Sequence, residues 1–147
     1  MPYIKVYIHF VWSTKNRIPY LKTKKIRSLI WNHIFHNARN KGIFVDSVNG
    51  YSDHCHCLIS LGANQNIQKI MQLIKGESSF WVNKEKIIGD TKFEWQEEYF
   101  AVSVSESKIG IVRNYIKNQE EHHRKKTFQE EYEEFISKYG FERFTDK

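Results

Sequence analysis

The order of strand-like and helix-like segments is the feature that most restricts how this chain can fold. Four segments rich in β-branched and aromatic residues are interleaved with two segments whose apolar residues recur every three or four positions. We expect strands over residues 3–13, 43–48, 54–61 and 99–104, and helices over 22–41 and 66–82. This β-α-β-β-α-β order predicts an α+β fold of the ferredoxin-like type, a four-stranded antiparallel sheet with helices on one face. Folds of this type serve RNA binders, enzymes and regulators, so function has to be argued from particular residues.

Glycines and a hairpin signal set the expected boundaries of these elements. Gly42 is expected to close the first helix. Asn49-Gly50 is a typical hairpin-turn pair and predicts the turn between the second and third strands. Gly76 lies inside the second helix, where it either ends the helix or allows a close approach of the backbone to a partner.

The C-terminal part is expected to be helical. Ser105 is a candidate N-cap for a helix over residues 106–123, and apolar spacing predicts a short docked helix over 128–139. A length of 147 residues suits one core. We therefore expect a single domain over residues 1–147, in which 124–147 form a helical tail.

The distribution of charge favours a polyanionic partner. The chain has 23 Lys and Arg residues against 17 Asp and Glu residues, which gives a net charge of +6 and an isoelectric point near 9.2. The excess is uneven, because residues 1–119 carry +8 and residues 120–147 carry −2. A basic body suits nucleic acid, the commonest polyanion, although a basic surface also serves solubility alone.

No segment predicts a membrane span or a secretion signal. No apolar run approaches the roughly 20 residues that cross a bilayer, and Lys5 and His9 interrupt the apolar N-terminal strand. Cys55 and Cys57 are two residues apart, too close for an ordinary disulfide within a strand, and the chain has no other cysteine. We therefore expect a cytoplasmic protein with no membrane partner.

A His-x-His pair is the first candidate for chemistry. His54 and His56 lie on the third predicted strand, where alternation sends both to one face and Cys55 and Cys57 to the other. Two imidazoles on one face can share a metal ion, although an isolated pair of this kind is more often polar surface. The cysteines do not complete a zinc site, because they face away from the histidines and no third thiolate exists.

A Tyr-x-x-x-Gln pattern is the second candidate. Tyr115 and Gln119 are four residues apart in a predicted helix, so they share a face, and His122 lies on the same side one turn further. The apolar stripe of this helix runs beside that face. Tyr115 is thus expected at the rim of the core with its hydroxyl in solvent, a position that suits a packing residue or a nucleophile.

Five motifs, in order along the chain, resemble those of a known family. They are His9-Phe-Val-Trp-Ser-Thr-Lys-Asn-Arg17, Asp53-His-Cys-His56, Lys75-Gly-Glu-Ser-Ser79, Trp95-Gln-Glu-Glu-Tyr-Phe-Ala-Val-Ser103 and Tyr115-Ile-Lys-Asn-Gln119. With the basic composition, they resemble the HUH nucleases, and most closely the single-tyrosine transposases of the smallest insertion sequences (the IS200-like superfamily) and the related REP-associated tyrosine transposases. One departure is Cys55 in place of a bulky aliphatic residue between the histidines, and a buried cysteine acts as a small hydrophobe.

The resemblance implies a metal site and a nucleophile. His54, His56 and Gln119 would hold one divalent cation, Mg²⁺ or Mn²⁺, that polarises the scissile phosphate. Tyr115 would attack that phosphate and leave a 5′-phosphotyrosine and a free 3′-hydroxyl. A second 3′-hydroxyl can reverse the step, so the protein would be a transposase that both cuts and rejoins single-stranded DNA.

The resemblance also implies partners and a setting. Single-stranded DNA with hairpins at the element ends would be the substrate, the protein would form a homodimer, and its host would be a bacterium or archaeon. Whether Tyr115 completes the site of its own subunit or of its neighbour stays open. The candidate phosphate contacts, chosen by position and charge, are Lys15, Arg17, Lys22, Lys24, Lys25 and Lys75.

Two other functions remain open on sequence grounds. A non-catalytic hairpin-DNA or RNA-binding module, derived from such a transposase, would need the basic surface but not Tyr115. A zinc-dependent hydrolase built on His54, His56 and His122 would cut without forming a covalent protein–DNA adduct. Replacing Tyr115 with phenylalanine separates all three functions.

Overall fold

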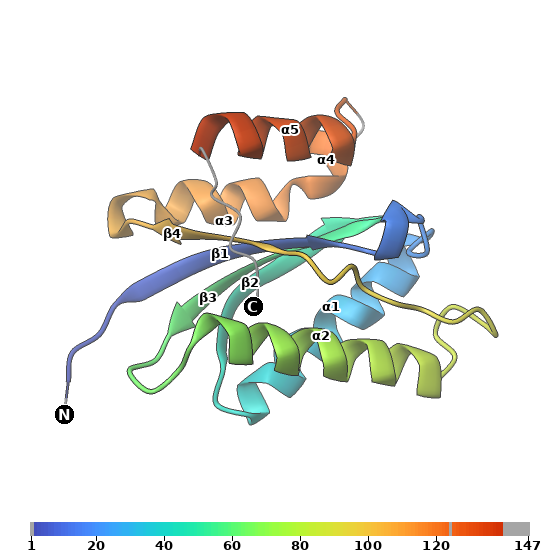
Figure 1. Cartoon of the computed structure of the whole chain (residues 1–147), viewed down its shortest axis with the longest axis horizontal. Helices are drawn as coiled ribbons and strands as arrows, with labels where there is room; N and C mark the ends of the chain where they lie inside the picture. The colour runs from blue at the N-terminus through green and yellow to red at the C-terminus, as the bar shows by residue number, and fades with distance from the viewer. Residues whose placement is uncertain (1, 124, 140–147) are drawn as a thin grey trace, which may run out of the picture.

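One antiparallel sheet organises the chain, with its strands in the order β2-β3-β1-β4. The computed structural model describes residues 2–123 and 125–139, and none of its helices is long and apolar enough to cross a membrane (Figure 1). The strands are β1 (Val6–Ser13), β2 (Phe44–Tyr51), β3 (His54–Leu61) and β4 (Phe100–Val104). The helices are α1 (Lys24–Asn40), α2 (Ile67–Lys84), α3 (Ile109–Lys117), α4 (Gln119–His123) and α5 (Phe128–Tyr139), with 3-10 turns η1 (Lys15–Arg17) and η2 (Glu106–Lys108). The predicted α+β fold is confirmed.

The helices α1 and α2 cover one face of the sheet (Figure 1). Each begins at a capping side chain, since Thr23 accepts from the Ile26 N–H at 3.1 Å and Asn66 accepts from the Lys69 N–H at 2.8 Å. The apolar faces of both helices pack on one side of the strands. The main core between them includes Phe10, Trp12, Ile30, Ile34, Cys55, Cys57, Ile59, Ile70, Met71 and Ile74.

The helices α3, α4 and α5 lie over the other face of the sheet (Figure 1). Ile109 and Ile116 of α3 pack against Leu58 of β3 in a second, smaller core. Arg113 of α3 donates two hydrogen bonds to the Asp46 carboxylate on β2, at 2.9 and 2.7 Å. These contacts hold α3 against the face that carries the two histidines of β3.

The hairpin between β2 and β3 turns at residues 52–53, so the prediction of a turn at Asn49-Gly50 is wrong. Both residues lie inside β2, opposite β3. The glycine is needed there for a close approach between the strands: a Cβ on Gly50 would lie 2.1 Å from the main-chain oxygen of His54. The pair therefore serves the sheet, and Ser52 and Asp53 make the turn.

The predicted helix over residues 106–123 is interrupted. Residues 106–108 form the turn η2, and Asn118, with φ −98° and ψ 25°, separates α3 from α4. Ser105 precedes η2 but makes no capping hydrogen bond with its side chain. Gly76 lies inside α2, which continues past it, so the alternative in which it ends the helix is wrong.

The end of α1 and the bounds of α5 agree with the boundaries predicted from the sequence. Gly42 closes α1 in the left-handed conformation, with φ +80°, and its N–H donates to the Arg39 oxygen at 3.0 Å. The helix predicted over 128–139 is α5. Residues 124 and 140–147 of the expected tail lie outside the described residues, and the single domain over 1–147 stays a prediction.

Candidate metal and tyrosine site

The two histidines of β3 are buried side by side under the C-terminal helices. His54 and His56 are both 0% exposed, and their ring centroids are 5.2 Å apart. Across the sheet, Ser13 of β1 lies opposite His54 and Val11 lies opposite His56. Since alternate residues of a strand share a face, the intervening cysteine points into the other core, and both imidazoles face α3, α4 and α5.

Each imidazole is oriented by a neighbour at its Nδ1 atom. Nδ1 of His54 lies 2.9 Å from Oδ1 of Asp53, and Nδ1 of His56 lies 2.9 Å from Nε2 of His9 on β1. With Nδ1 as the donor in each pair, both Nε2 atoms keep a lone pair, and both point toward Glu131 of α5. Metal-ligating histidines are commonly held by such acceptors. His9 thus orients the ring of His56 in the same way as Asp53 orients the ring of His54.

The junction of α3 and α4 brings Tyr115 and Gln119 to these histidines. Gln119 is fully buried, and its Oε1 atom lies 3.1 Å from Nε2 of His54. Its Nε2 atom donates to the main-chain oxygen of Tyr115 at 3.3 Å. The Tyr115 ring meets the His56 ring edge-on, with centroids 5.4 Å apart. Tyr115 and Gln119 therefore face the same side, as their four-residue spacing predicted, although the helix is broken between them at Asn118.

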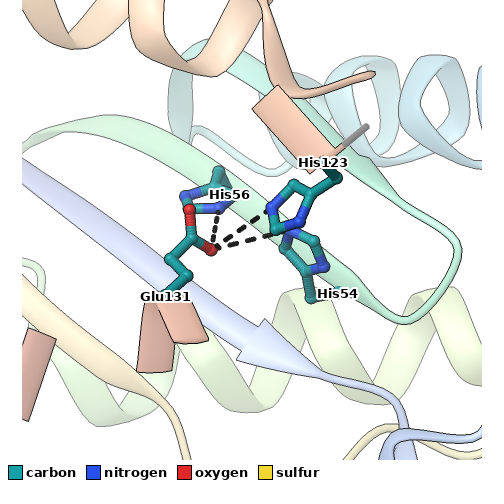
Figure 2. A group of neighbouring side chains, drawn as sticks. All are labelled: His54, His56, His123 and Glu131. Carbon is teal, nitrogen blue, oxygen red and sulfur yellow. Dashed lines mark hydrogen bonds and ion pairs between the residues drawn. The ribbon is translucent and has the colours of Figure 1, made fainter. Parts of the chain in front are cut away.

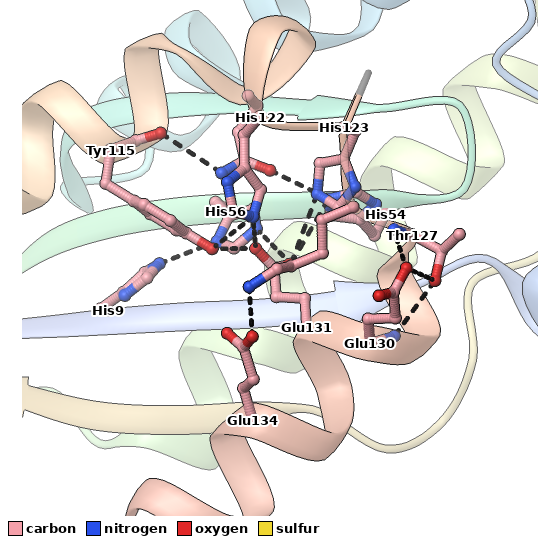
Figure 3. Close-up of polar contacts among 12 residues, drawn as sticks. His9, His54, His56, Tyr115, His122, His123, Thr127, Glu130, Glu131 and Glu134 are labelled. Atoms are coloured by element: carbon pink, nitrogen blue, oxygen red, sulfur yellow. Dashed lines mark hydrogen bonds and ion pairs between the residues drawn. The ribbon is translucent and has the colours of Figure 1, made fainter.

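A carboxylate from α5 lies between these groups (Figure 3). Glu131 is 2% exposed, and its Oε1 atom lies 3.1 Å from Nε2 of His56 and 3.7 Å from Nε2 of His54. The Tyr115 hydroxyl donates to Oε2 of the same carboxylate, and Nε2 of His122 lies 3.2 Å from that oxygen. One carboxylate therefore joins the candidate nucleophile to the candidate metal-binding nitrogens.

The donor atoms fit a divalent cation (Figure 2). One ligand atom each from His54, His56, His123 and Glu131 lies within 4.8 Å of all the others, and the Gln119 oxygen lies beside His54. Nε2 of His123 is buried and makes no hydrogen bond within the described residues, and it lies 3.6 Å from Oε1 of Glu131, so it is available as a metal ligand beside that carboxylate. Imidazole nitrogens combined with carboxylate or amide oxygens suit first-row divalent metals.

Burial lowers the pKa values of His9, His56 and His123 at this site. It lowers the pKa of His123 to about 4, with help from the neighbouring histidines, and lowers the pKa of His9 to about 3. The pKa of His56 is also held well below its usual range by burial and by the surrounding imidazoles. Burial raises the pKa of Glu131 to about 7. Neutral imidazoles offer the free lone pair that a metal ligand requires.

Of the six cationic residues predicted to contact DNA, the structure brings Arg17 next to this site. Its guanidinium lies 5.4 Å from the ring centroid of Phe128, and Phe128 stacks on His54 with centroids 4.4 Å apart. Lys75 lies on α2, across the sheet from the histidines, and donates to the main-chain oxygen of Glu97 at 2.8 Å. The other four are exposed in η1 and around the start of α1: Lys15, Lys22, Lys24 and Lys25.

Three residues of the site were not predicted from the sequence. His9 had a signal, because it opens the first family-like motif and lies on a strand expected to be central. No feature of the sequence pointed to Glu131, since only the docking of α5 distinguishes it from the other glutamates of that helix. His123, and not the predicted His122, belongs to the group of possible ligand atoms, whereas His122 lies 3.4 Å from the Tyr115 hydroxyl.

Fold and site together define a class: α+β proteins whose central strand carries a His-x-His pair, faced by a tyrosine and a glutamine from the helices after the fourth strand. The sequence model of the family described as "Transposase IS200 like" matches residues 3–119, a span that runs from before β1 to the first residue of α4. The chain therefore belongs to the IS200-like transposase family, and the predicted resemblance is confirmed.

Two solved structures share this fold. A candidate transposase from Deinococcus radiodurans R1 has a TM-score of 0.63 and 21% identity, over 80% of this chain and 93% of that chain. A REP-associated tyrosine transposase bound to a REP hairpin has a TM-score of 0.61 and 17% identity, over 84% of this chain and 72% of that chain. No curated protein sequence matches this chain.

Proposed function

We propose that this member of the IS200-like transposase family cleaves and rejoins single-stranded DNA at insertion-sequence ends, with Tyr115 as the nucleophile. One observation carries the proposal. The Tyr115 hydroxyl donates to the Glu131 carboxylate, whose other oxygen lies 3.1 Å from Nε2 of His56. A phosphate that took the place of this carboxylate would be within reach of both the phenol and the imidazoles, which is the proximity that phosphoryl transfer needs.

The proposed reaction is a transesterification. The phenolic oxygen of Tyr115 gives up its proton and forms a bond to the scissile phosphorus, and the bond from phosphorus to the 3′ oxygen breaks. That oxygen takes up one proton to become a 3′-hydroxyl, so the numbers of protons lost and gained are equal. The product is a 5′-phosphotyrosine. Because one phosphodiester has replaced another, attack by a 3′-hydroxyl reverses the step and joins DNA without a nucleotide cofactor.

We assign His54, His56 and Gln119 as ligands of Mg²⁺ or Mn²⁺, with Glu131 and His123 within reach of the same ion. When bound, such an ion acts as a Lewis acid toward the phosphate oxygens. Support comes from the buried Nε2 atoms of His54 and His56, which lie 3.7 and 3.1 Å from one and the same oxygen of Glu131. Gln119 of α4 also links the metal site to the nucleophile on α3, because its Nε2 atom donates to the main-chain oxygen of Tyr115 at 3.3 Å.

We propose hairpin-bearing single-stranded DNA as the partner. The charge of +8 over residues 1–119 suits a polyanion, and the solved REP-associated tyrosine transposase is bound to a REP hairpin. A single strand can bend to present one phosphate to a buried site, which a duplex cannot do without melting. The proposed phosphate contacts remain Lys15, Arg17, Lys22, Lys24, Lys25 and Lys75.

We further propose that Tyr115 acts at the metal site of its own chain, within the homodimer expected from the resemblance. Three contacts support this by tying α3 and α4 to the rest of the same chain. Asn49 binds the end of α3 at 2.9 Å, Arg113 pairs with Asp46 at 2.7 Å, and a distance of 2.9 Å separates the charged groups of Arg27 and Glu120.

The test is the formation of a covalent adduct. The protein is incubated with Mn²⁺ and hairpin-bearing single strands from the DNA that flanks its gene, and the products are separated under denaturing conditions. The wild-type protein is expected to give a protein-linked DNA band. Tyr115→Phe removes one oxygen atom and is expected to bind the strand without forming the band.

The possible outcomes separate the alternative functions. Binding without cleavage by the wild-type protein would favour a non-catalytic hairpin-binding module. Cleavage that survives Tyr115→Phe and leaves no adduct would favour a metal-dependent hydrolase. Duplex DNA of the same sequence is the control, and equal cutting of both forms would contradict the single-stranded substrate.

A further inference from the structure

A pocket of about 290 Å³ lies beside the metal and tyrosine site, on the same face of the sheet. Its walls come from β1, η1, the segment that leads into β4, β4 itself and α5. Phe128 is a shared wall, because it lines the pocket and also stacks on His54. Small-molecule pockets begin at about 300 Å³, so this one has room for a single planar ring system.

The register of the sheet places this pocket close to the metal and tyrosine site. His56 of β3, Val11 of β1 and Phe100 of β4 lie in one row across three adjacent strands. Neighbouring strands are about 4.8 Å apart, so the backbones of His56 and Phe100 are separated by about 10 Å. A DNA strand with one phosphate at the histidines would therefore pass the pocket within a nucleotide or so of that phosphate.

The walls combine aromatic rings with side-chain amides. The rings of Phe100 and Tyr132 meet with centroids 5.2 Å apart, and the Arg17 guanidinium lies 4.5 Å over the Tyr132 ring. Asn16 and Gln96 add amide groups, each of which can donate and accept hydrogen bonds. Aromatic faces and amides are the groups by which proteins stack on and read an unpaired base.

The charge of the lining favours a base over a phosphate. Among the described lining residues, Arg17 is the one cation and Glu98 the one anion, so their formal charges are equal and opposite. A phosphate site would carry an excess of positive charge. A partly apolar cavity whose lining carries no excess charge suits an uncharged heterocycle with polar edges.

The backbone of η1 is held in an unusual conformation at this pocket. Asn16 and Arg17 have φ values of +57° and +56°, a region that costs free energy for an arginine. The Gln96 Oε1 atom accepts a hydrogen bond from the Asn16 N–H at 3.1 Å, which fixes the turn to the opposite wall segment. The turn thereby aims Arg17 at the aromatic wall.

We propose that this pocket binds one nucleobase of the DNA strand, next to the scissile phosphate. The base stacks on the aromatic wall and forms hydrogen bonds with the amides of Asn16 and Gln96. This inference rests on the proposed function, since it takes the cleaved single strand as the ligand. In addition to the proposed reaction, the pocket would let the protein recognise one base at the cleavage site directly.

The test uses full-length Tyr115→Phe protein, which holds the strand without cutting it. Single strands from the DNA flanking the gene carry the fluorescent base 2-aminopurine at one position each, moved stepwise past the cleavage site. We expect strong quenching on binding at one position. Adding Tyr132→Leu is expected to abolish that quenching and to weaken binding roughly tenfold, whereas Tyr132→Phe keeps the ring and retains both.

Two further variants sharpen the test. Gln96→Ala removes an amide from the wall and is expected to weaken binding several-fold while the quenching persists. Lys92→Ala changes an exposed residue of the same segment outside the pocket and is expected to match the parent protein.

The experiments can disprove the proposed base pocket and the proposed function independently of each other. Quenching at no position, or quenching unchanged by Tyr132→Leu, would overturn the pocket even if the wild-type protein forms its adduct. Quenching that depends on Tyr132 in a protein that forms no adduct would keep the pocket and overturn the proposed reaction. Failure to bind single strands at all would overturn both.

Discussion

Asn49 on β2 binds the main-chain oxygen of Ile116 at the end of α3. The side-chain Nδ2 atom lies 2.9 Å from that oxygen and 3.1 Å from the main-chain oxygen of Lys117. The last carbonyls of a helix have no partner within the helix, so this amide both satisfies them and fixes α3 to the sheet. Since Tyr115 directly precedes Ile116, the position of the proposed nucleophile depends on a residue of β2.

Replacing Asn49 with alanine should disturb the reaction more than it disturbs folding. Losing these hydrogen bonds is expected to lower the free energy of unfolding by about 1–2 kcal/mol. Adduct formation is expected to slow about tenfold, because small displacements of a nucleophile are costly. Chemical denaturation and single-turnover assays check the two effects. Asn114→Ala, an exposed asparagine on α3, is the matched control, and equal effects of both variants would argue against the clamp.

His9 is expected to control the affinity of the metal site without touching the metal. His9→Ala removes the acceptor at Nδ1 of His56, and loss of such a partner typically costs about 10–100-fold in metal affinity. His9→Gln retains an acceptor oxygen and should lose less. Calorimetric titration with Mn²⁺ measures both.

The matched control for His9 is His33, which bonds to Glu77 between α1 and α2 on the other face of the sheet. His33→Ala is expected to bind Mn²⁺ as the wild-type protein does. If His9→Ala also binds it with unchanged affinity, the orienting role of His9 is wrong.

Gly50, which the sequence predicted in a turn, and Gly76, whose role the sequence left open, should respond in opposite directions when replaced by alanine. A Cβ on Gly50 meets the His54 main chain at 2.1 Å, so Gly50→Ala is expected to destabilise the fold by about 1–3 kcal/mol. A Cβ on Gly76 meets nothing within 4 Å, so Gly76→Ala should stabilise α2 by about 0.5–1 kcal/mol. Urea unfolding of both variants tests the strand register, and a stabilising Gly50→Ala would contradict it.

The stability of the fold should rise in mildly alkaline solution because of Lys75. Burial lowers the pKa of this amine from 10.5 to about 8. Between these two values the unfolded chain keeps a proton that the folded chain has released, so the free energy of unfolding increases with pH. Below the lower value both states hold the proton, and the contribution no longer changes.

Substitution of Lys75 isolates its contribution from other titrating groups. Lys75→Met should remove part of the difference in unfolding free energy between about pH 7 and about pH 10. Lys69→Met, at an exposed position of α2, should leave that difference intact. Equal pH profiles for the two variants would count against a lowered pKa at the half-buried Lys75.

The fold and the centre of the site could be predicted because their signals are local. Alternating apolar residues and helical spacing predicted the strands and crossover helices, and alternation along β3 placed His54 and His56 on one face. The same locality explains the errors. Asn49-Gly50 has the composition of a turn, but the contacts that give these residues their roles lie far along the chain, at Ile116 and across the hairpin.

The rest of the site depends on tertiary docking. Glu131 reaches the histidines only because α5 folds back over the sheet, and His9 reaches His56 only through the register of β1 and β3. No periodicity within either segment encodes these contacts. If the register of β1 against β3 had been known, it would have been enough to predict that His9 lies near His56.

The most direct test of the account is to identify the residue that becomes linked to DNA. The adduct formed with Mn²⁺ is digested with nuclease and protease, and the peptides are examined by mass spectrometry. The predicted result is a nucleotide phosphate on the peptide that contains Tyr115. A phosphate on another tyrosine, such as Tyr99 or Tyr132 of the neighbouring pocket, would contradict the assignment, as would cleavage with no modified peptide.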